Sequence, residues 1–322
     1  MKKEETLEIV VLDSRPLDVG DLDWSELHAL GHLTLYEHTA PEEVLARASA
    51  ADVLLVNKVV LDRSIIEQLP KLKYIGLLAS GYNNVDIACA RERGIIVTNA
   101  SGYGTMSVAQ HTLALMLAAC NEIPLHHEST HYGEWSSSWC YWKRPIVELA
   151  GKQLGVVGLG NIGYQVARMA RALGMWVVAY HPDKAEVQRK GARWVSLDEL
   201  FATSDVVSLH CPLTPETTKL VNAHRLSLMK PTAVLVNTAR GALIDEAALF
   251  EALSNNRIKA AALDVLAQEP PPPGHPLLTL PNCIVTPHNA WSSHESRSRL
   301  LAIVADNLRS FIEGKPKNVV NA

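Results

Sequence analysis

The chain has 322 residues, a formal net charge of -4, 48% hydrophobic residues and 20% charged residues. These values predict a folded protein with two domains, because a single hydrophobic core rarely extends over this length. They exclude a disordered chain, and the absence of a long basic run argues against a nucleic-acid partner. An anionic small molecule is still a possible ligand, since one buried Arg can hold a carboxylate.

The N-terminus and the cysteines bear on where the protein works. Met1–Glu8 is charged and lacks the apolar core and cleavage site of a signal peptide. The longest uncharged apolar stretch, Val108–Cys120, falls short of the roughly 20 residues that cross a bilayer. Five scattered cysteines without a C-x-x-C pair predict reduced thiols and no metal site. We therefore expect a cytoplasmic protein without a membrane partner.

The N-terminal part of the chain alternates short apolar runs with segments of helical spacing. Pro41–Ala50 and Ser64–Leu69 are two such helical segments. This alternation is typical of β-α-β units, and it predicts a parallel sheet with helices on both faces. Five strands are expected, at Leu7–Asp13, Leu33–Glu37, Asp52–Asn57, Tyr74–Ser80 and Ile95–Thr98.

The middle of the chain interrupts this alternation. Val108–Asn121 has the composition of a long apolar helix, and the following segment, His126–Trp142, is rich in Trp, Ser and His. We interpret this segment as a connector and a contact between two subunits, because its Trp and Tyr side chains would otherwise be exposed. The alternative is that the segment packs against its own domain.

The alternation begins again after Leu149. A final helix, Glu295–Glu313, is placed to return to the first domain. Six strands are expected, at Gln153–Gly158, Trp176–His181, Asp205–His210, Ala233–Thr238, Ala260–Val265 and Cys283–Thr286. Helices are expected between them, at Ile162–Leu173, Leu197–Ala202, Ala223–Leu228 and Glu246–Ser254.

These elements predict an α/β protein of two Rossmann-like or flavodoxin-like domains with parallel sheets and a cleft between them. We assign residues 1–102 and 295–322 to one domain and residues 103–294 to the other.

The clearest local motif is Gly158-Leu-Gly160-Asn-Ile-Gly163, between a predicted strand and a predicted helix. Three glycines at this spacing allow a tight turn, a close approach to a pyrophosphate and close packing of the helix on the strand. The free N–H groups at the start of the helix favour phosphate. The alternative is a purely structural turn.

The acidic residue that usually binds the ribose would end the next strand. His181 stands at that position, followed by Asp183 and Lys184. Asp183 offers a carboxylate to the ribose from two residues later, whereas His181 with Lys184 would tolerate a 2′-phosphate. No Arg follows the strand directly, so we expect NAD, with NADP as the alternative.

Three polar residues follow predicted strands in the C-terminal part: Arg240, Glu269 and His288. The carboxyl ends of strands form the ligand crevice of an open parallel sheet. There a guanidinium clamps a carboxylate, and a His gives or takes a proton near neutral pH while a carboxylate orients its ring. Taken singly, each has an ordinary alternative as a strand cap, a solvated loop carboxylate or one of 13 histidines.

Several further motifs occur in order along almost the whole chain. They are Ser80-Gly-Tyr-Asn-Asn-Val-Asp86, Ser107-Val-Ala-Gln-His111, Trp139-Cys-Tyr-Trp142, His210-Cys-Pro-Leu-Thr-Pro-Glu-Thr217, Asn237-Thr-Ala-Arg-Gly241 and Ala262-Leu-Asp-Val265. With the glycine-rich turn, and with Glu269 and His288 at the family's spacing, this chain resembles the D-isomer-specific 2-hydroxyacid dehydrogenases. Within them it resembles the branch of glycerate dehydrogenases and hydroxypyruvate reductases.

The resemblance implies a reaction and a set of roles. Residues 1–102 and 295–322 would be the substrate (catalytic) domain, and residues 103–294 the NAD(P)-binding domain. His288 would be the acid/base paired with Glu269, and Arg240 would hold the substrate carboxylate and carbonyl oxygen. The resemblance also implies homodimers and a small 2-keto or 2-hydroxy acid as substrate, such as hydroxypyruvate with glycerate or glyoxylate with glycolate. Substrate contacts would come from Ala79, Ser80 and Gly81, and cofactor contacts from Gly158, Gly160, Asn161, Ile162, Gly163, His181, Cys211, Pro212, Thr217, Thr238, Ala239 and Asp264.

Two other functions fit the same motifs. A phosphite-type dehydrogenase shares them, whereas a formate enzyme pairs its His with Gln, which Glu269 contradicts. A non-enzymatic NAD-dependent interaction protein is the other, although such a protein would carry partner-binding tails that we do not expect beyond the last helix.

Overall fold

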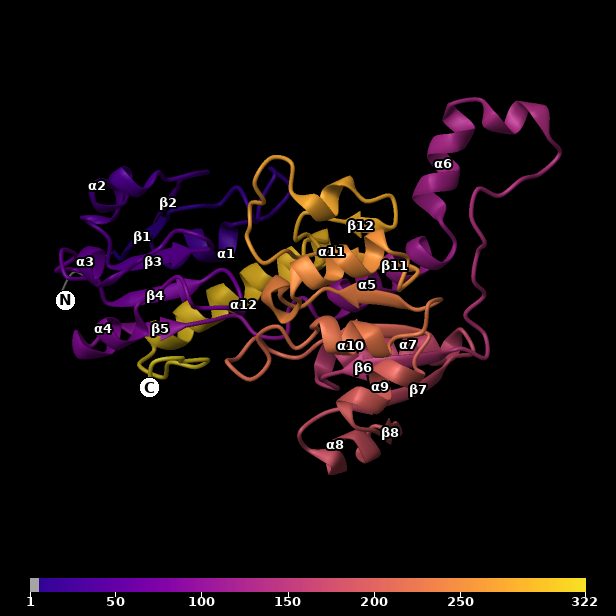
Figure 1. The fold of residues 1–322 in the computed structure, drawn as a ribbon. Coiled ribbons are helices and arrows are strands. Elements are labelled where there is room, and N and C mark those ends of the chain that lie inside the picture. The colour runs from indigo at the N-terminus through magenta and orange to yellow at the C-terminus, as the bar shows by residue number, and fades with distance from the viewer. Residues whose placement is uncertain (1–5) are drawn as a thin grey trace. The chain divides into compact units, whose positions relative to one another are not determined.

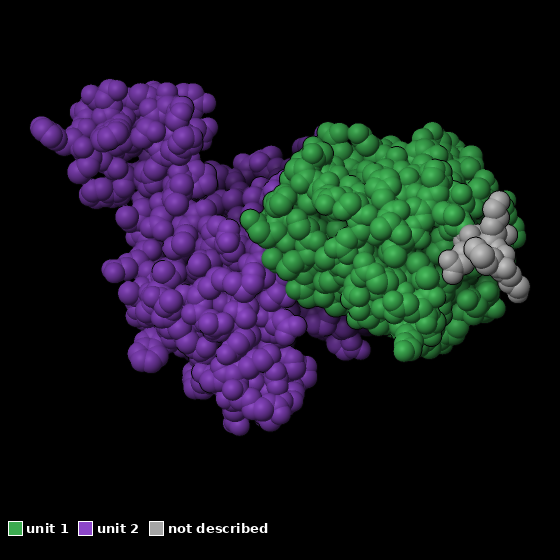
Figure 2. Space-filling view, turned by 180° about the vertical axis from the view of Figure 1, so that it is seen from behind, with its two compact units in different colours: residues 1–104, 292–322 green, residues 105–291 purple. Residues whose placement is uncertain are grey.

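The computed structural model describes residues 6–322, which form two compact units. Unit 1 comprises Met1–Gly104 and Ser292–Ala322, and unit 2 comprises Thr105–Trp291 (Figure 2). Part of the charged N-terminus in which we expected no signal peptide, residues 1–5, lies outside the described residues. Both units are built on parallel sheets with helices, so the predicted α/β fold class is confirmed.

Unit 1 has a five-stranded parallel sheet in the order β2-β1-β3-β4-β5 (Figure 1). This is the order of a flavodoxin-like fold. The strands are β1 (Glu8–Val11), β2 (His32–Leu35), β3 (Val53–Val56), β4 (Tyr74–Leu77) and β5 (Ile96–Thr98). The α-helices are α1 (Ser25–His28), α2 (Val44–Ala48), α3 (Arg63–Ile66), α4 (Ile87–Glu92) and α12 (His294–Ile312), and a 3-10 turn, Pro41–Glu43, leads into α2.

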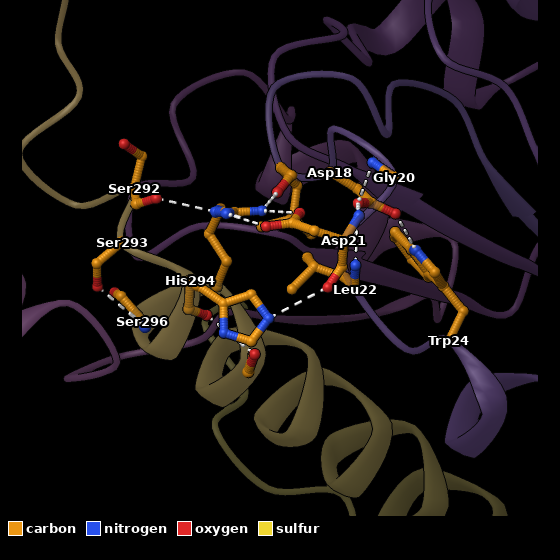
Figure 3. Close-up of polar contacts among 12 residues, drawn as sticks. Asp18, Gly20, Asp21, Leu22, Trp24, Ser292, Ser293, His294 and Ser296 are labelled. Atoms are coloured by element: carbon orange, nitrogen blue, oxygen red, sulfur yellow. Dashed lines mark hydrogen bonds and ion pairs between the residues drawn. The ribbon is translucent and has the colours of Figure 1, made fainter.

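The start of α12 is tied to the loop after β1, far away in the sequence (Figure 3). Arg297 donates from Nη1 and Nη2 to the two carboxylate oxygens of Asp21, at 2.7 Å each. The same guanidinium also donates to the carbonyl oxygens of Leu17 and Ser292. Asp18 folds this loop by accepting from three backbone N–H groups and from the indole of Trp24. The two ends of the chain thus complete unit 1 together.

Unit 2 has a seven-stranded parallel sheet in the order β12-β11-β10-β9-β6-β7-β8. Its strands are β6 (Gln153–Val157), β7 (Trp176–Tyr180), β8 (Arg193–Trp194), β9 (Val206–Leu209), β10 (Val234–Asn237), β11 (Ala260–Leu263) and β12 (Cys283–Val285). Its α-helices are α5 (Thr105–Cys120), α6 (Ile123–His131), α7 (Asn161–Ala172), α8 (Lys184–Arg189), α9 (Leu197–Thr203), α10 (Ala223–Leu228) and α11 (Glu246–Ser254), and 3-10 turns lie at Glu134–Ser137, Gly241–Leu243 and Pro276–Thr279.

Both faces of the unit 2 sheet are covered, as the continuous apolar strands predicted. In β10, Val234 and Val236 pack with residues of α5 and α7, whereas Leu235 packs with residues of α9, α10 and α11. This alternation follows from the two-residue period of a strand. No helix within residues 6–322, α5 included, is both long enough and apolar enough to cross a membrane.

The sequence predicted six strands in this part, and the structure adds β8. Arg193 and Trp194 contain no apolar run, so no two-residue period was visible there. The helices α1, α4, α6 and α8 were also missed, since each is short or polar and its sequence shows no apolar stripe.

The Trp-rich segment belongs to an arm that projects from the rest of unit 2 (Figure 1). Helix α6 forms the first part of this arm. Trp135, Trp139 and Trp142 are 56%, 99% and 69% exposed, so packing against the same domain is wrong for these side chains. The arm is braced internally, because Tyr141 Oη hydrogen-bonds Ser129 Oγ at 2.5 Å.

Candidate active site

The predicted cofactor and catalytic residues of unit 2 lie along one edge of its sheet. Every strand pair in this sheet is parallel, so the carboxyl ends of the strands share one edge. The strand order reverses between the neighbours β6 and β9, which marks the switch point where doubly wound folds bind ligands. The glycine-rich turn follows β6 and lies at this point.

Two of the three glycines of the turn are required by close backbone contacts, and the third faces open space. Gly158 has a φ of +90°, and a Cβ on it would lie 2.6 Å from the backbone nitrogen of Cys211. A Cβ on Gly163 would lie 2.3 Å from the carbonyl oxygen of Gly158, so helix α7 packs directly on the turn. A Cβ on Gly160 would meet nothing within 4 Å. Exposed Gly160 and Asn161 start α7, so the turn has the open space and the helix start that a pyrophosphate requires.

Asp183 is the acidic residue that follows β7 most closely. The carboxylate of Asp183 accepts from the backbone N–H groups of Ala185 and Glu186, where it caps α8. His181 Nδ1 lies 3.1 Å from the backbone nitrogen of Asp183 and 3.3 Å from its carbonyl oxygen, so the ring is held by the turn that follows β7. Lys184 lies over the ring of Trp194, with Nζ 3.9 Å from the centroid. Of the alternatives left open by the sequence, ribose binding by Asp183 is disfavoured.

The loop after β9 contains the next predicted cofactor residues. Cys211 and Thr217 are partly exposed and Pro212 is exposed. The Thr217 hydroxyl donates to the carbonyl oxygen of Pro212 at 2.7 Å and closes the loop on itself. Burial raises the pKa of the Cys211 thiol to about 11, so the thiol stays protonated and does not act as a nucleophile.

Arg240 ends the loop after β10 and is exposed. Buried Asn237 shapes this loop, since it accepts from the N–H of Ala239 and donates to the carbonyl oxygen of Arg240. A Cβ on Gly241 would lie 1.9 Å from the carbonyl carbon of Leu266, so this glycine allows the loops after β10 and β11 to touch. The guanidinium of Arg240 donates from Nη1 to the carbonyl oxygen of Ala239 at 2.7 Å and has no carboxylate partner within residues 6–322, so its other N–H groups can bind an anion.

Glu269 and His288 meet, as the spacing predicted. His288 Nδ1 lies 2.5 Å from Glu269 Oε2, and the other oxygen of Glu269 accepts from the N–H of Leu266 at 3.0 Å. The side chain of His288 is 29% exposed and that of Glu269 is 35% exposed. Because a carboxylate accepts hydrogen bonds, Nδ1 holds a proton and Nε2 is the nitrogen that can exchange one.

The three residues expected at the nicotinamide end are largely buried. Thr238 is 9% exposed and its hydroxyl hydrogen-bonds Thr112 of α5. Ala239 is partly exposed. Asp264 is 1% exposed and its carboxylate is already bonded to the segment around His288. The structure thus gives Asp264 an internal role that the sequence did not indicate.

Ala79, Ser80 and Gly81 belong to unit 1, where they follow β4. Ser80 Oγ donates to the carbonyl oxygen of Ala100, and Asn99 donates to the carbonyl oxygen of Ser80. The N–H groups of Ser80 and Gly81 have no acceptor within the described chain, so both can bind an anion.

Three contributors to this edge were missed from the sequence. Asn237, Thr286 and His111 act through hydrogen bonds to residues of other segments. Asn237 and His111 lie in quoted motifs, and Thr286 ends the predicted strand Cys283–Thr286, but no role was predicted for any of them. Within residues 6–322 no cluster of three His, Cys, Asp or Glu side chains is placed to hold a metal ion.

A doubly wound parallel sheet with a glycine-rich turn at its switch point, and a His–Glu pair on the same edge, defines a dinucleotide-binding protein of the dehydrogenase class. Comparison with known proteins narrows this class.

Residues 113–290 match the family model described as "D-isomer specific 2-hydroxyacid dehydrogenase, NAD binding domain". The chain is 44% identical to a hydroxypyruvate reductase of Blautia hydrogenotrophica and 40% identical to a glycerate dehydrogenase of Methylorubrum extorquens, with 98% of this chain and 100% of each relative covered. The chain belongs to the D-isomer-specific 2-hydroxyacid dehydrogenases.

A solved structure agrees over both units. The NADPH-dependent glyoxylate/hydroxypyruvate reductase of Sinorhizobium meliloti, in complex with NADP and malonate, is 28% identical with a TM-score of 0.83. The alignment covers 98% of this chain and 97% of that one. The protein is therefore an NAD(P)-dependent oxidoreductase that interconverts a D-2-hydroxy acid and its 2-keto acid, as the sequence predicted.

Proposed function

We propose that this enzyme reduces hydroxypyruvate and glyoxylate, with His288 as the acid that protonates the keto oxygen. The observation that carries the proposal is the 2.5 Å contact between His288 Nδ1 and Glu269 Oε2. It leaves Nε2 as the proton donor, in the geometry that acid/base catalysis requires. The names of the most similar relatives support small keto acids as substrates.

Each residue of the set has a distinct task. Glu269 orients the imidazole ring through its hydrogen bond with Nδ1. Arg240 pairs with the substrate carboxylate and stabilises the charge that develops on the carbonyl oxygen. In the oxidative direction His288 takes the hydroxyl proton instead. The N–H groups of Ser80 and Gly81, next to Ala79, bind the substrate carboxylate as further donors.

We assign the cofactor to the switch-point edge of unit 2. The amides at Gly160, Asn161 and Ile162 face the pyrophosphate, His181 faces the adenosine ribose, and the groove is lined by Cys211, Pro212, Thr217, Thr238 and Ala239. The bound dinucleotide supplies the hydride that the carbonyl carbon receives. On this assignment unit 2 is the NAD(P)-binding domain and unit 1 the substrate domain.

We also propose that the enzyme is a homodimer formed through the arm. The arm carries three exposed Trp side chains beside a hollow of about 830 Å³ lined by Ile123, Tyr141, Trp142, Pro145 and Ile146, among others. An aromatic patch of this kind favours association, and a twofold axis would pair it with the same patch of a second copy.

The five free cysteines support a cytoplasmic location.

The test follows the oxidation of NADH and of NADPH by hydroxypyruvate, glyoxylate and pyruvate. An assay with phosphate in place of the keto acid is the blank. We expect turnover with the first two acids and a loss of roughly 10²- to 10⁴-fold in His288→Ala. Full activity in that variant would contradict the role of His288. NADH binding without turnover of any acid, together with NAD reduction by phosphite, would replace the proposed substrates by phosphite.

A further inference from the structure

The carboxylate of Asp264 holds both sides of His288. Oδ1 accepts from the Thr286 hydroxyl at 2.6 Å and from the N–H of Asn289 at 3.0 Å. Oδ2 accepts from the N–H of Ala290 at 2.9 Å. Since Asp264 is 1% exposed, this carboxylate depends on these donors in place of water. Residues 286 to 290 are therefore wrapped around one buried anion.

His288 itself has an unfavourable backbone conformation. Its φ is +52°, in the left-handed region that residues with a side chain rarely adopt. Its N–H donates to the carbonyl oxygen of Asp264 at 2.8 Å, and its carbonyl oxygen accepts from the indole of Trp291 at 2.9 Å. Such a conformation persists only where the surroundings over-determine it. The direction of the imidazole therefore depends on the contacts of its neighbours.

His111 of α5 provides one of these contacts. Its Nε2 lies 3.1 Å from Thr286 Oγ1 and 3.5 Å from Asp264 Oδ1. The single hydroxyl proton of Thr286 is committed to the carboxylate, which can only accept. The Thr286 oxygen is then the acceptor, and Nε2 of His111 must be the donor. The hydrogen bonds run in one direction, from His111 through Thr286 to Asp264.

A second contact comes from the same face of α5. Ser107 lies one turn before His111, and its hydroxyl donates to the carbonyl oxygen of Ala290 at 2.7 Å. Residues four apart in a helix share a face. Ser107 and His111 thus contact the two ends of the segment that carries His288. Helix α5 is itself packed against α7, β10 and β11, so it is a rigid support.

We propose that His111 is a positioning residue for proton transfer, which acts through Thr286 and Asp264 to hold the imidazole of His288 in its reactive direction. The proposal rests on the proposed role of His288 as the acid. The proposal does not require His111 to contact the substrate or the cofactor. Removal of the donor should therefore impair the chemical step and leave cofactor binding intact.

Two substitutions at one site separate this role from simple packing. His111→Leu keeps a side chain of moderate size and removes the donor, whereas His111→Gln keeps an N–H donor at about the same reach. We expect His111→Leu to lower kcat for hydroxypyruvate roughly 10- to 100-fold, because small displacements of reacting groups cost that much. We expect the Kd for NADH to stay within about twofold, and His111→Gln to recover most of the rate.

A double substitution tests the route through Thr286. Thr286→Val should resemble His111→Leu, and the double variant should be no slower than the slower single variant, because both break the same chain of hydrogen bonds. Gln110→Ala, at an exposed neighbouring position of α5, should leave kcat unchanged. Fully multiplicative losses would overturn the proposal, and so would a parallel loss of NADH affinity.

A second readout needs no turnover. Amide hydrogen exchange of residues 288–290, whose N–H groups bind Asp264, should accelerate in His111→Leu and return towards wild type in His111→Gln. Unchanged exchange in His111→Leu overturns the proposal even if none of the tested acids is a substrate. If exchange is faster in His111→Leu but the wild-type enzyme turns over none of the tested acids, only the proposed function is contradicted.

Discussion

At the scale of single residues, several side chains at the carboxyl-end edge of the unit 2 sheet hold the candidate catalytic side chains in place. Asn237 shapes the loop of Arg240, and Glu269 fixes the tautomer of His288. Glu269 in turn receives the N–H of Leu266. Each supporting bond removes a rotamer that a catalytic group would otherwise sample, which is how a site gains accuracy.

Glu269 is expected to act through both its oxygen and its charge. Glu269→Gln keeps an oxygen that can accept from His288 Nδ1, so we expect a loss of roughly tenfold in kcat, whereas Glu269→Ala should lose roughly 100-fold. Steady-state rates with hydroxypyruvate check this order. Equal rates in the two variants would mean that the oxygen contributes nothing beyond the charge.

His181 is expected to govern the choice between NAD and NADP. His181→Asp places a carboxylate at the end of β7, where it can accept from the ribose hydroxyls and would repel a 2′-phosphate. The ratio of kcat/KM for NADH to that for NADPH should rise roughly tenfold or more. Gln188→Asp, an exposed change on α8, serves as the control. An unchanged ratio in His181→Asp would place cofactor selection elsewhere.

At the scale of elements, the fold was readable where burial is complete. Strands such as β3, β9 and β10 are buried throughout and consist mostly of Val and Leu, so their sequences stand out from polar loops. The two residues of β8 and the short helices carry no such signal. The link from His111 to Thr286 joins residues 175 positions apart, so no local pattern could reveal it.

The end of β9 should limit stability in mild acid. Burial lowers the pKa of His210 from 6.5 to about 4, so the native state disfavours the proton that the unfolded state accepts. Stability present above pH 6.5 is then lost as the pH falls towards 4, by up to about 3 kcal/mol. Urea unfolding at these pH values should show a smaller loss in His210→Asn. An equal loss in His210→Asn, with exposed His28→Asn as the reference, would contradict this origin.

The beginning of α12 should depend on Asp21. In Asp21→Ala the guanidinium of Arg297, whose side chain is 10% exposed, loses its carboxylate and keeps only carbonyl partners. We expect a clear loss in the free energy of unfolding, smaller than for a fully buried pair because Asp21 is exposed. The exposed pair of Glu26 with Arg309 is the control, and Glu26→Ala should cost less than about 1 kcal/mol. Similar costs in both variants would show that the first pair is only a surface contact.

At the scale of the whole molecule, the arm determines the expected assembly. The wild-type chain of 35.2 kDa should scatter light as a species of twice that mass. Trp139→Ser combined with Trp142→Ser should shift the equilibrium towards the monomer, because it removes the two most exposed of the three Trp side chains of the arm. Trp176→Ser, at another Trp that is 72% exposed in unit 2, should leave the mass unchanged. A wild-type monomer would refute the proposed dimer.

The construction of unit 1 from both ends of the chain affects how the protein emerges from the ribosome. Strand β5 receives its last neighbours from the C-terminal residues, since Asn321 bonds to Ile95 and Val97 and a bridge joins Thr98 to Val319. Unit 2 is a single stretch of chain and can complete its sheet while translation continues. Strand β5 is translated before unit 2, whereas its C-terminal neighbours are translated after unit 2, so nascent unit 1 has an unfinished sheet edge that must not pair with other chains until Val319 and Asn321 are synthesised.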